Sequence, residues 1–183
     1  SVAVVKKPTD SSEQVEGVKF STEYGKIDII WLDTENKVIS KPNVPQLTAN
    51  GESLIPIKWD EGNNIVPTTP DDSNWYNYDE HKWANAKTKN ESLFVWIPRY
   101  AYRITYYESE TSDKVTGYYD GYGQWSAATG EIRLALDSGV ETVKHNGEKY
   151  IVHPAFETNL ENGGWDKDLS GMWVAKFEAN GTG

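Results

Sequence analysis

The sequence contains no cysteine and only three histidines among its 183 residues. Without cysteine the chain has no disulfide, no thiolate nucleophile and no cysteine-based metal site. The histidines, His81, His145 and His153, lie far apart in the sequence, and none belongs to a spaced histidine or histidine–carboxylate motif of the kind that binds zinc. We therefore expect no bound metal and no cofactor.

Basic residues are scarce. The chain has 18 lysines and arginines against 28 carboxylates, so its formal net charge is -10 and its isoelectric point is about 4.8. A surface of this sign repels phosphate backbones and anionic membranes. The sequence also lacks a signal-peptide pattern and any apolar run near the ~18 residues of a membrane-spanning helix. It predicts no nucleic-acid partner and no direct membrane span in this chain.

Catalytic motifs are missing as well. No Gly-x-Ser-x-Gly elbow occurs, and no glycine-rich phosphate loop precedes a helical segment. A catalytic pair cannot be chosen among 28 carboxylates from sequence alone, and two-carboxylate glycosidase chemistry needs a deep cleft. We expect no enzyme activity. The alternative is a carboxylate-dependent, carbohydrate-active enzyme.

Large aromatic rings are abundant instead. The chain has 8 tryptophans and 11 tyrosines, yet its mean hydropathy is -0.68. This combination predicts a polar, loop-rich chain whose core is built from a few large rings. The length suits one domain, or one domain with a small appendage.

The strongest strand signal lies in residues 92–107, which are β-branched or aromatic almost throughout. The segment 93–97 is apolar on both faces of an extended chain, which is typical of a buried, central strand. Pro98 cannot donate to a ladder, and the residues after it alternate in polarity. We predict one long strand, bent at Pro98, buried first and half exposed afterwards. We also expect three buried tryptophans: Trp31, Trp96 and Trp173.

Hairpins are expected where two strand-like runs flank a short turn. The predicted pairs are residues 26–32 with 37–40, 54–59 with 64–67, and 141–144 with 149–152. A last strand is predicted over residues 172–178. The turn at 60–64 carries oxygens that suit calcium, on Asp60, Glu61, Asn63 and Asn64, but without EF-hand spacing. We interpret it as an ordinary polar turn.

Composition divides the chain into three parts. Residues 1–16 combine an apolar strip, Val2–Val5, with a polar linker, and predict an extended arm or tether. The alternative is an arm that adds a strand to a neighbouring subunit. Residues 17–45 are predicted to be a β-hairpin segment, and residues 46–183 the main β-rich domain with long loops.

Two aromatic loops are the candidate ligand site, because binding residues collect on loops that a rigid sheet positions. Rings beside carboxylates and amides suit neutral sugars or basic protein surfaces, since a ring stacks on the apolar face of a sugar. In the alternative interpretation, Trp75 and Trp83 are core plugs that hold the first loop in place. The candidate ligand-binding residues are Trp75, Tyr76, Tyr78, Tyr119, Tyr122 and Trp125.

Several segments between residues 27 and 178 resemble a group of surface and prophage proteins of Firmicutes, some with pilin-like N-terminal segments. The later part is similar to the opening of the formylglycine-generating, sulfatase-modifying-factor type of domain, a C-type-lectin-like fold. The enzymes of that superfamily use cysteines, which this chain lacks, and their domain continues beyond the strand matching 172–178. No functional residue is therefore transferred. The segments are 27–33, 75–78, 82–86, 94–102, 153–156 and 163–178.

The resemblance implies a mainly β fold (α+β with little helix) of C-type-lectin-like type. The alternative is an immunoglobulin-like β-sandwich, which short strands with frequent turns also suit. Together with the acidic, cysteine-free composition, the resemblance implies a non-catalytic extracellular module on a bacterial cell surface or filament, or on a phage particle. Such a module acts by self-association, by binding another surface protein, or by adhesion to a neutral carbohydrate. A phage receptor-binding protein is the closest alternative.

Overall fold

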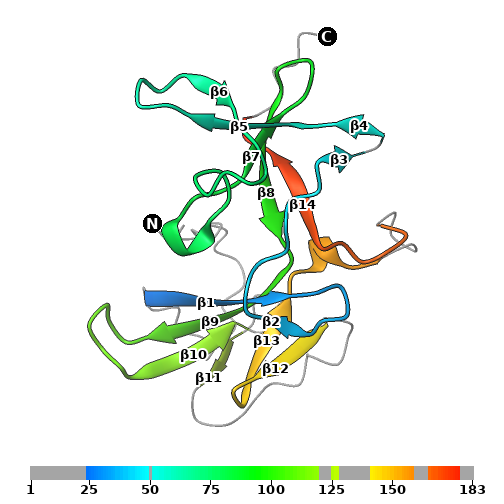
Figure 1. Cartoon of the computed structure of the whole chain (residues 1–183). Coiled ribbons are helices and arrows are strands. Elements are labelled where there is room, and N and C mark those ends of the chain that lie inside the picture. Colours follow the sequence, from blue (N-terminus) through cyan, green and yellow to red (C-terminus); the bar gives the residue numbers. More distant parts are fainter. Residues whose placement is uncertain (1–23, 50, 120–124, 128–140, 159–164, 178–183) are drawn as a thin grey trace, which may run out of the picture. The chain divides into compact units, whose positions relative to one another are not determined.

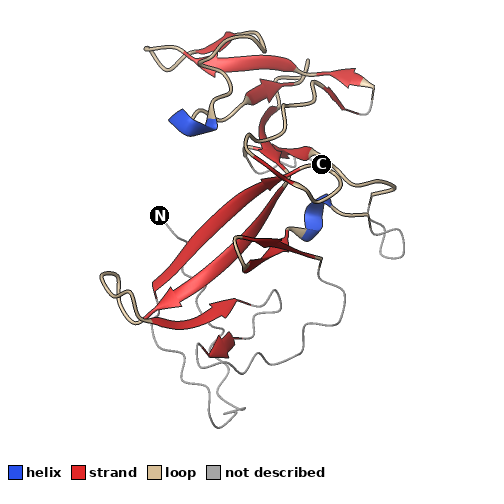
Figure 2. Cartoon of the chain, turned by 60° about the horizontal axis from the view of Figure 1, so that its bottom comes forward, coloured by secondary structure: helices blue, strands red, loops and turns tan. Residues whose placement is uncertain are grey.

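The computed structural model describes residues 24–49, 51–119, 125–127, 141–158 and 165–177 (Figure 1). Strands account for 49% of the structure and helices for 5%, and the paired strands run antiparallel. The predicted mainly β class is confirmed. Figure 2 shows the helical part as short 3-10 turns, η1 (Tyr78–Glu80) and η3 (Pro154–Phe156). In the described part of the chain, no helix has the length and apolar character to span a membrane.

The chain divides into two compact units. Unit 1 comprises residues 1–29 and 102–140, and unit 2 comprises residues 30–101 and 141–183. Strands β1 (Tyr24–Leu32) and β9 (Tyr100–Tyr107) each contribute residues to both. The predicted arm, residues 1–16, lies outside the described residues. The predicted boundary between residues 45 and 46 falls inside unit 2.

In unit 1, β10 (Val115–Tyr119) pairs with β9 and with β11 (Trp125–Ala127). The second of the two predicted aromatic loops is the stretch 118–125, which carries Tyr119, Tyr122 and Trp125. This expectation is wrong at both ends of the stretch, where Tyr119 lies opposite Trp125 in the β10–β11 pair. The strong β propensity of tyrosine and tryptophan prevails there. Residues 120–124 lie outside the described residues.

One sheet of unit 2 has five strands in the order β14-β8-β7-β5-β6. The predicted central position of residues 93–97 is confirmed, since β8 lies between β14 and β7. The predicted pairing of 54–59 with 64–67 is confirmed as the β5–β6 hairpin. The strands are β14 (Gly171–Ala175), β8 (Leu93–Pro98), β7 (Asn85–Lys87), β5 (Ile55–Trp59) and β6 (Ile65–Pro67).

The β5–β6 turn is closed by its own side chains. The Asp60 carboxylate accepts hydrogen bonds from the backbone N–H groups of Gly62 (2.9 Å) and Asn64 (2.8 Å). Asn63 adopts a left-handed conformation, with φ of 60°, which asparagine tolerates in turns. The Asp60 carboxylate therefore closes the turn between the two strands.

The other two predicted hairpins are also present in unit 2. The end of β1 pairs with β2 (Val38–Ile39), and β12 (Thr142–His145) pairs with β13 (Glu148–Val152). Asn146 and Gly147 have φ of 50° and 82°, the positive values that a two-residue hairpin turn requires. A further short pair joins β3 (Thr48–Ala49) to β4 (Glu52–Ser53). One buried cluster joins β1, β9 and β13: Ile30, Leu32, Ala101, Tyr150 and Val152.

The predicted single strand over residues 92–107 is wrong. The chain forms two strands, β8 and β9, which pair in different sheets. The change occurs at Arg99, whose N–H donates to the carbonyl of Ser170 (2.9 Å) and whose carbonyl accepts from the N–H of Leu32 (3.2 Å). Pro98, which lacks a donor, ends β8 at this point. The expected bend is thus a transfer of the chain from one sheet to another.

Burial of the tryptophans follows prediction only in part. Trp96 is 1% exposed and lies in a cluster with Trp75 and Ala84. Trp31 and Trp173 are half-buried, so their predicted burial is wrong. Trp173 lies on the edge strand β14, where a ring has neighbours on one side, and its Nε1 donates to the carbonyl of Gln46 (2.6 Å).

The side chain of Arg99 is fully buried and hydrogen-bonded through each of its nitrogens. Nη1 donates to the carbonyl of Phe156 (2.8 Å), and Nη2 to the Asn36 amide oxygen (2.7 Å). Nη2 also faces the carboxylates of Glu157 (3.1 Å) and Asp168 (3.7 Å). A buried cation costs several kcal/mol unless it is paired and hydrogen-bonded. The segments that carry these acceptors and carboxylates must therefore meet around the guanidinium when unit 2 folds.

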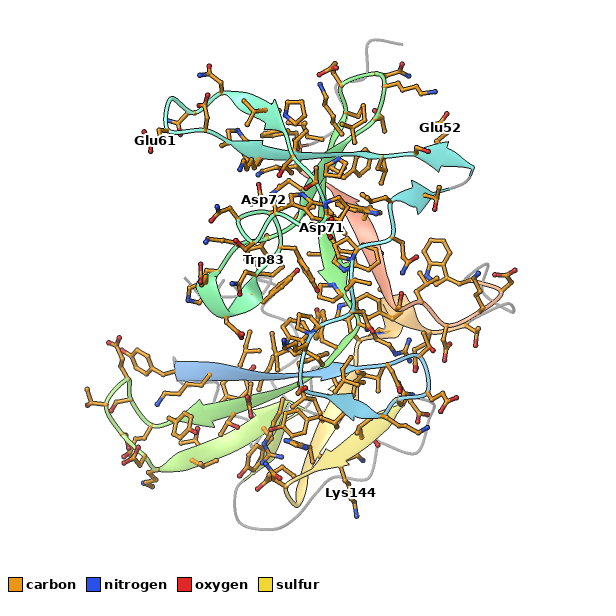
Figure 3. All side chains as sticks on the ribbon, in the orientation of Figure 1. Glu52, Glu61, Asp71, Asp72, Trp83 and Lys144 are labelled. Atoms are coloured by element: carbon orange, nitrogen blue, oxygen red, sulfur yellow. The ribbon has the colours of Figure 1, made fainter. Side chains whose placement is uncertain are left out.

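We predict that Arg99→Met lowers the free energy of unfolding by about 3–5 kcal/mol, because it leaves several acceptors and two carboxylates without their buried partner. Chemical denaturation followed by tryptophan fluorescence measures the change. Lys144→Met, which removes an exposed cation from β12 (Figure 3), is the matched control and should change stability little. Equal stability of the two variants would contradict the role of Arg99.

Candidate functional site

The long loop between β6 and β7 carries the first group of predicted site residues, and Asp72 anchors its start. The Asp72 carboxylate accepts hydrogen bonds from Lys58 Nζ (2.6 Å), the Thr68 hydroxyl (2.7 Å) and the N–H of Asn74 (2.8 Å). Lys58 belongs to β5. The carboxylate therefore ties the loop to the five-stranded sheet just before the aromatic residues begin.

Trp75 belongs to the core. It is 2% exposed, and its ring packs in the cluster with Ala84 and Trp96. Its indole N–H donates to the carbonyl of Asn85 (2.7 Å). The plug interpretation is therefore confirmed for Trp75, and this residue is removed from the candidate ligand-contacting set, because its ring has no face available for stacking.

Tyr76 and Tyr78 are half-buried supports whose polar ends are already engaged. The Tyr76 hydroxyl donates to the carbonyl of Asn43 (2.6 Å), and the Tyr78 hydroxyl donates to the carbonyl of Trp96 (2.9 Å). Burial raises the pKa of both phenols, so both hydroxyls stay protonated and keep donating. Only the rings of these tyrosines remain for contacts with other groups.

Trp83 is the exposed ring of this region. It is 45% exposed, so the interpretation of Trp83 as a core plug is wrong. Its ring lies 4.7 Å from that of Tyr78, which in turn meets Trp31 and Tyr76 edge-on, at 5.2 Å each. We call these four residues, Trp31, Tyr76, Tyr78 and Trp83, the aromatic cluster.

A closed turn positions Trp83. Asn77 and Lys82 exchange two backbone hydrogen bonds, of 3.0 and 2.8 Å. Within the turn, η1 ends at His81, which is left-handed with φ of 57°. Trp83 follows directly, and its carbonyl accepts from the Asn85 side-chain amide (2.7 Å). The ring is thus carried by a backbone bonded on both sides, and little conformational entropy remains to be lost when it is contacted.

The loop that carries the exposed ring also contains a hydrogen-bonded group of polar side chains. The Lys82 ammonium donates to the Asn74 amide oxygen (2.8 Å) and to the Glu80 carboxylate. An amide, a cation and a carboxylate therefore lie in the loop that holds Trp83, which is labelled in Figure 3. A flat ring in a loop that also carries donors and acceptors suits a ligand that is apolar on one face and hydroxylated at its edges.

The second group of predicted site residues lies elsewhere in the chain. Tyr119 is the last residue of β10 and Trp125 the first of β11, both in unit 1. Tyr122 lies outside the described residues. Among the six candidates, the structure brings Trp75, Tyr76 and Tyr78 together, and of these Tyr76 and Tyr78 belong to the aromatic cluster.

The sequence-based site omitted two members of the aromatic cluster, Trp31 and Trp83. A signal for Trp83 was present, because Ala84 and Ala86 are small, apolar residues at alternate positions, and both are fully buried. Alternation of this kind directs the residues at the other positions, Trp83 and Asn85, away from the core. No local pattern indicated Trp31, which reaches Tyr78 across 47 positions of sequence, the difference between residues 31 and 78.

The described residues bring one pair of carboxylates to a shared partner, Glu157 and Asp168, which both face the guanidinium of Arg99. Burial raises the pKa of Glu157, and the hydrogen bond with Asn36 and the charge of Arg99 oppose the rise. The pair is thus engaged in the packing of unit 2. Within the described part of the chain, no group of three or more histidines and carboxylates is arranged to hold a metal ion.

Comparison with known proteins adds no relative: no protein-family model matches the chain, and neither does a curated protein or a solved structure. The geometry of the described residues is therefore the basis for the function proposed below.

We predict that Asp72→Asn destabilises the fold at pH 7 and that the loss shrinks on acidification. Hydrogen bonds from Lys58, Thr68 and Asn74 lower the pKa of Asp72 below its ordinary value of 3.8. A lowered carboxyl pKa contributes stability above the unfolded-state pKa, and this contribution is lost as the pH falls through the folded-state value. Urea denaturation at pH 7, where the whole contribution is present, and at about pH 3, below the unfolded-state pKa, where part of it is lost, measures this change. Asp71→Asn, at an exposed neighbour, is the control, and a pH-independent loss for Asp72→Asn would contradict the assignment.

Proposed function

We propose that this chain is a non-catalytic extracellular module of a bacterial cell surface that recognises a neutral carbohydrate through Trp83. The observation that carries the proposal is a half-exposed tryptophan ring supported by a second ring, Tyr78, whose hydroxyl is bound to the backbone of β8. Exposing a large apolar ring to water costs free energy, which a ligand covering the ring recovers. A ring already held in one place loses little conformational entropy when a ligand packs against it.

The charge of the chain favours a neutral ligand. The net charge is -10, and Glu80 lies two residues from the Lys82 ammonium that it pairs with. An anionic glycan would meet repulsion from the whole chain. A neutral sugar meets none, and its hydroxyls match the amide of Asn74 and the carboxylate of Glu80 as donors and acceptors.

A C-type-lectin-like fold is the finer assignment that we propose for the mainly β structure. Two segments of the resemblance, 94–102 and 163–178, contribute β8 and β14, which pair residue by residue from Phe94–Ala175 to Pro98–Gly171. Two segments of the resemblance that pair with each other belong to the same structural unit, which supports a fold shared with that family. The immunoglobulin-like sandwich remains the alternative, and a solved structure of the chain decides between them by its topology.

Other functions have weaker support. Assembly into a pilus-like filament is the second candidate, favoured by the unprotected edge of β14 described below. A receptor-binding protein displayed on a phage particle would use the same surface around Trp83 as a recognition module on a cell surface. A carboxylate-dependent enzyme requires two carboxylates about 5–10 Å apart across a cleft, whereas Glu157 and Asp168 are bound to a buried arginine.

We predict that Trp83→Ala weakens binding of a neutral glycan by at least about tenfold, equivalent to about 1.4 kcal/mol. A glycan array identifies the ligand, and titration calorimetry measures its affinity for the intact chain and the variant. Trp165→Ala is the matched control, because Trp165 is similarly exposed, at 49%, but makes none of the ring contacts of the aromatic cluster.

The control variant should bind as the intact chain does. Equal affinities for Trp83→Ala and the intact chain would remove this surface from consideration. Absence of binding to every neutral glycan on the array would reject carbohydrate recognition and leave assembly as the function to test.

A further inference from the structure

Strand β14 is one edge of the five-stranded sheet of unit 2. Among the described strands, β14 pairs with β8. The carbonyl of Ser170 and the N–H of Lys176 bond on the β8 side, to Arg99 (2.9 Å) and Leu93 (2.9 Å). Because alternate residues of a strand bond in opposite directions, the backbone groups of Gly171, Trp173 and Ala175 point away from β8.

Among the described residues, this edge lacks the devices that normally prevent strand addition. The β8–β14 register is unbroken over five residue pairs, so no bulge twists the edge away. β14 contains no proline, whereas β6, at the opposite edge, ends in Pro67. Apolar side chains are exposed at its end, most of all Phe177, at 66%.

A lysine next to an edge strand usually opposes pairing, but Lys176 is turned toward the sheet. Its Nζ lies 3.9 Å from the ring centroid of Trp59 and donates to the Asn85 amide oxygen (3.2 Å). Burial lowers the pKa of this ammonium, which agrees with its position against the sheet. The charge is therefore removed from the edge, and an apolar strand is free to approach.

The chain itself contains a segment suited to this edge, the strip Val2–Val5. It is uncharged, consists of valine and alanine, and nearly equals the five residues of β14 in length. Lys6 and Lys7 follow it directly, opposite in sign to the net charge of -10. The 18 residues from Lys6 to residue 23 can extend by about 60 Å, enough to reach another molecule.

We propose that the strip Val2–Val5 of one copy adds as a strand to the β14 edge of a second copy. Main-chain hydrogen bonds to Gly171, Trp173 and Ala175 provide the attachment, as in other cases of strand addition. Each copy offers one strip and one edge, so the contact is head-to-tail and continues from copy to copy, as in a filament. This assembly is independent of the carbohydrate recognition proposed for Trp83.

The test uses the full 183-residue chain and two pairs of variants. Ala175→Pro removes a single outward N–H and leaves the β8 ladder intact, whereas Ala175→Val keeps that N–H. Val4→Asp charges the strip, whereas Val4→Thr keeps its shape. Sedimentation velocity over a concentration series measures assembly, and circular dichroism checks the fold of each variant.

We expect concentration-dependent oligomers for the intact chain, Ala175→Val and Val4→Thr, and at least a tenfold rise in the half-assembly concentration for Ala175→Pro and Val4→Asp. If Ala175→Pro fails to fold, Val4→Asp alone decides, since it leaves every residue of the five-stranded sheet unchanged. The proposal is overturned if the intact chain stays monomeric, or if Val4→Asp assembles as readily as the intact chain.

The absence of native cysteine allows a second measurement. Val4→Cys and Ala175→Cys chains, mixed under oxidation, should form disulfide-linked pairs between the two variants. The double variant forming only an internal disulfide would place the strip on its own β14 edge and overturn addition to a second copy. Trp83→Ala should assemble as the intact chain does, so failure of this proposal and failure of carbohydrate recognition are separate outcomes.

Discussion

The packing of unit 2 depends on the burial of one guanidinium. Arg99 lies between two strands that pair in different sheets, and its five N–H groups are the reason that distant segments meet there. A cation enclosed in this way must be neutralised and hydrogen-bonded, because water no longer solvates it. The β1–β2 turn, η3 and the segment before β14 supply the acceptors, so their positions are coupled to the same point.

A second constraint is the hydrogen bonding of the aromatic side chains. Trp75, Trp96, Tyr76 and Tyr78 all donate to backbone carbonyls of residues distant in sequence. Each bond satisfies a polar group that burial of the ring would otherwise leave unpaired. The carbonyl of Asn43 accepts from both Tyr76 and Trp96, so an irregular segment without strands of its own is held against the sheet. The result is a hydrogen-bonded support for the aromatic cluster to which Trp83 belongs.

Local patterns predicted the hairpins well. The turn residues around Asp60 and at Asn146-Gly147 satisfy their own backbone, through an aspartate side chain in one case and positive φ angles in the other. Such signals act within a few residues and survive in any tertiary context. The central strand at Leu93 was also evident from composition. Its division at Arg99 was not, because the change of pairing partner depends on Leu32 and Ser170, which lie far away in sequence.

The amino-acid sequence by itself determined the β class, the hairpin turns, the acidic charge and the absence of cysteine chemistry, since each follows from residue type and short-range spacing. Only the tertiary structure decided which rings are buried and which are exposed. Trp75 and Trp83 stand in the same loop with similar neighbours, yet one lies in the core and the other reaches the surface. Burial depends on what the rest of the chain packs against a ring, and Trp31 and Trp96 reach these positions only when the strands that carry them fold together.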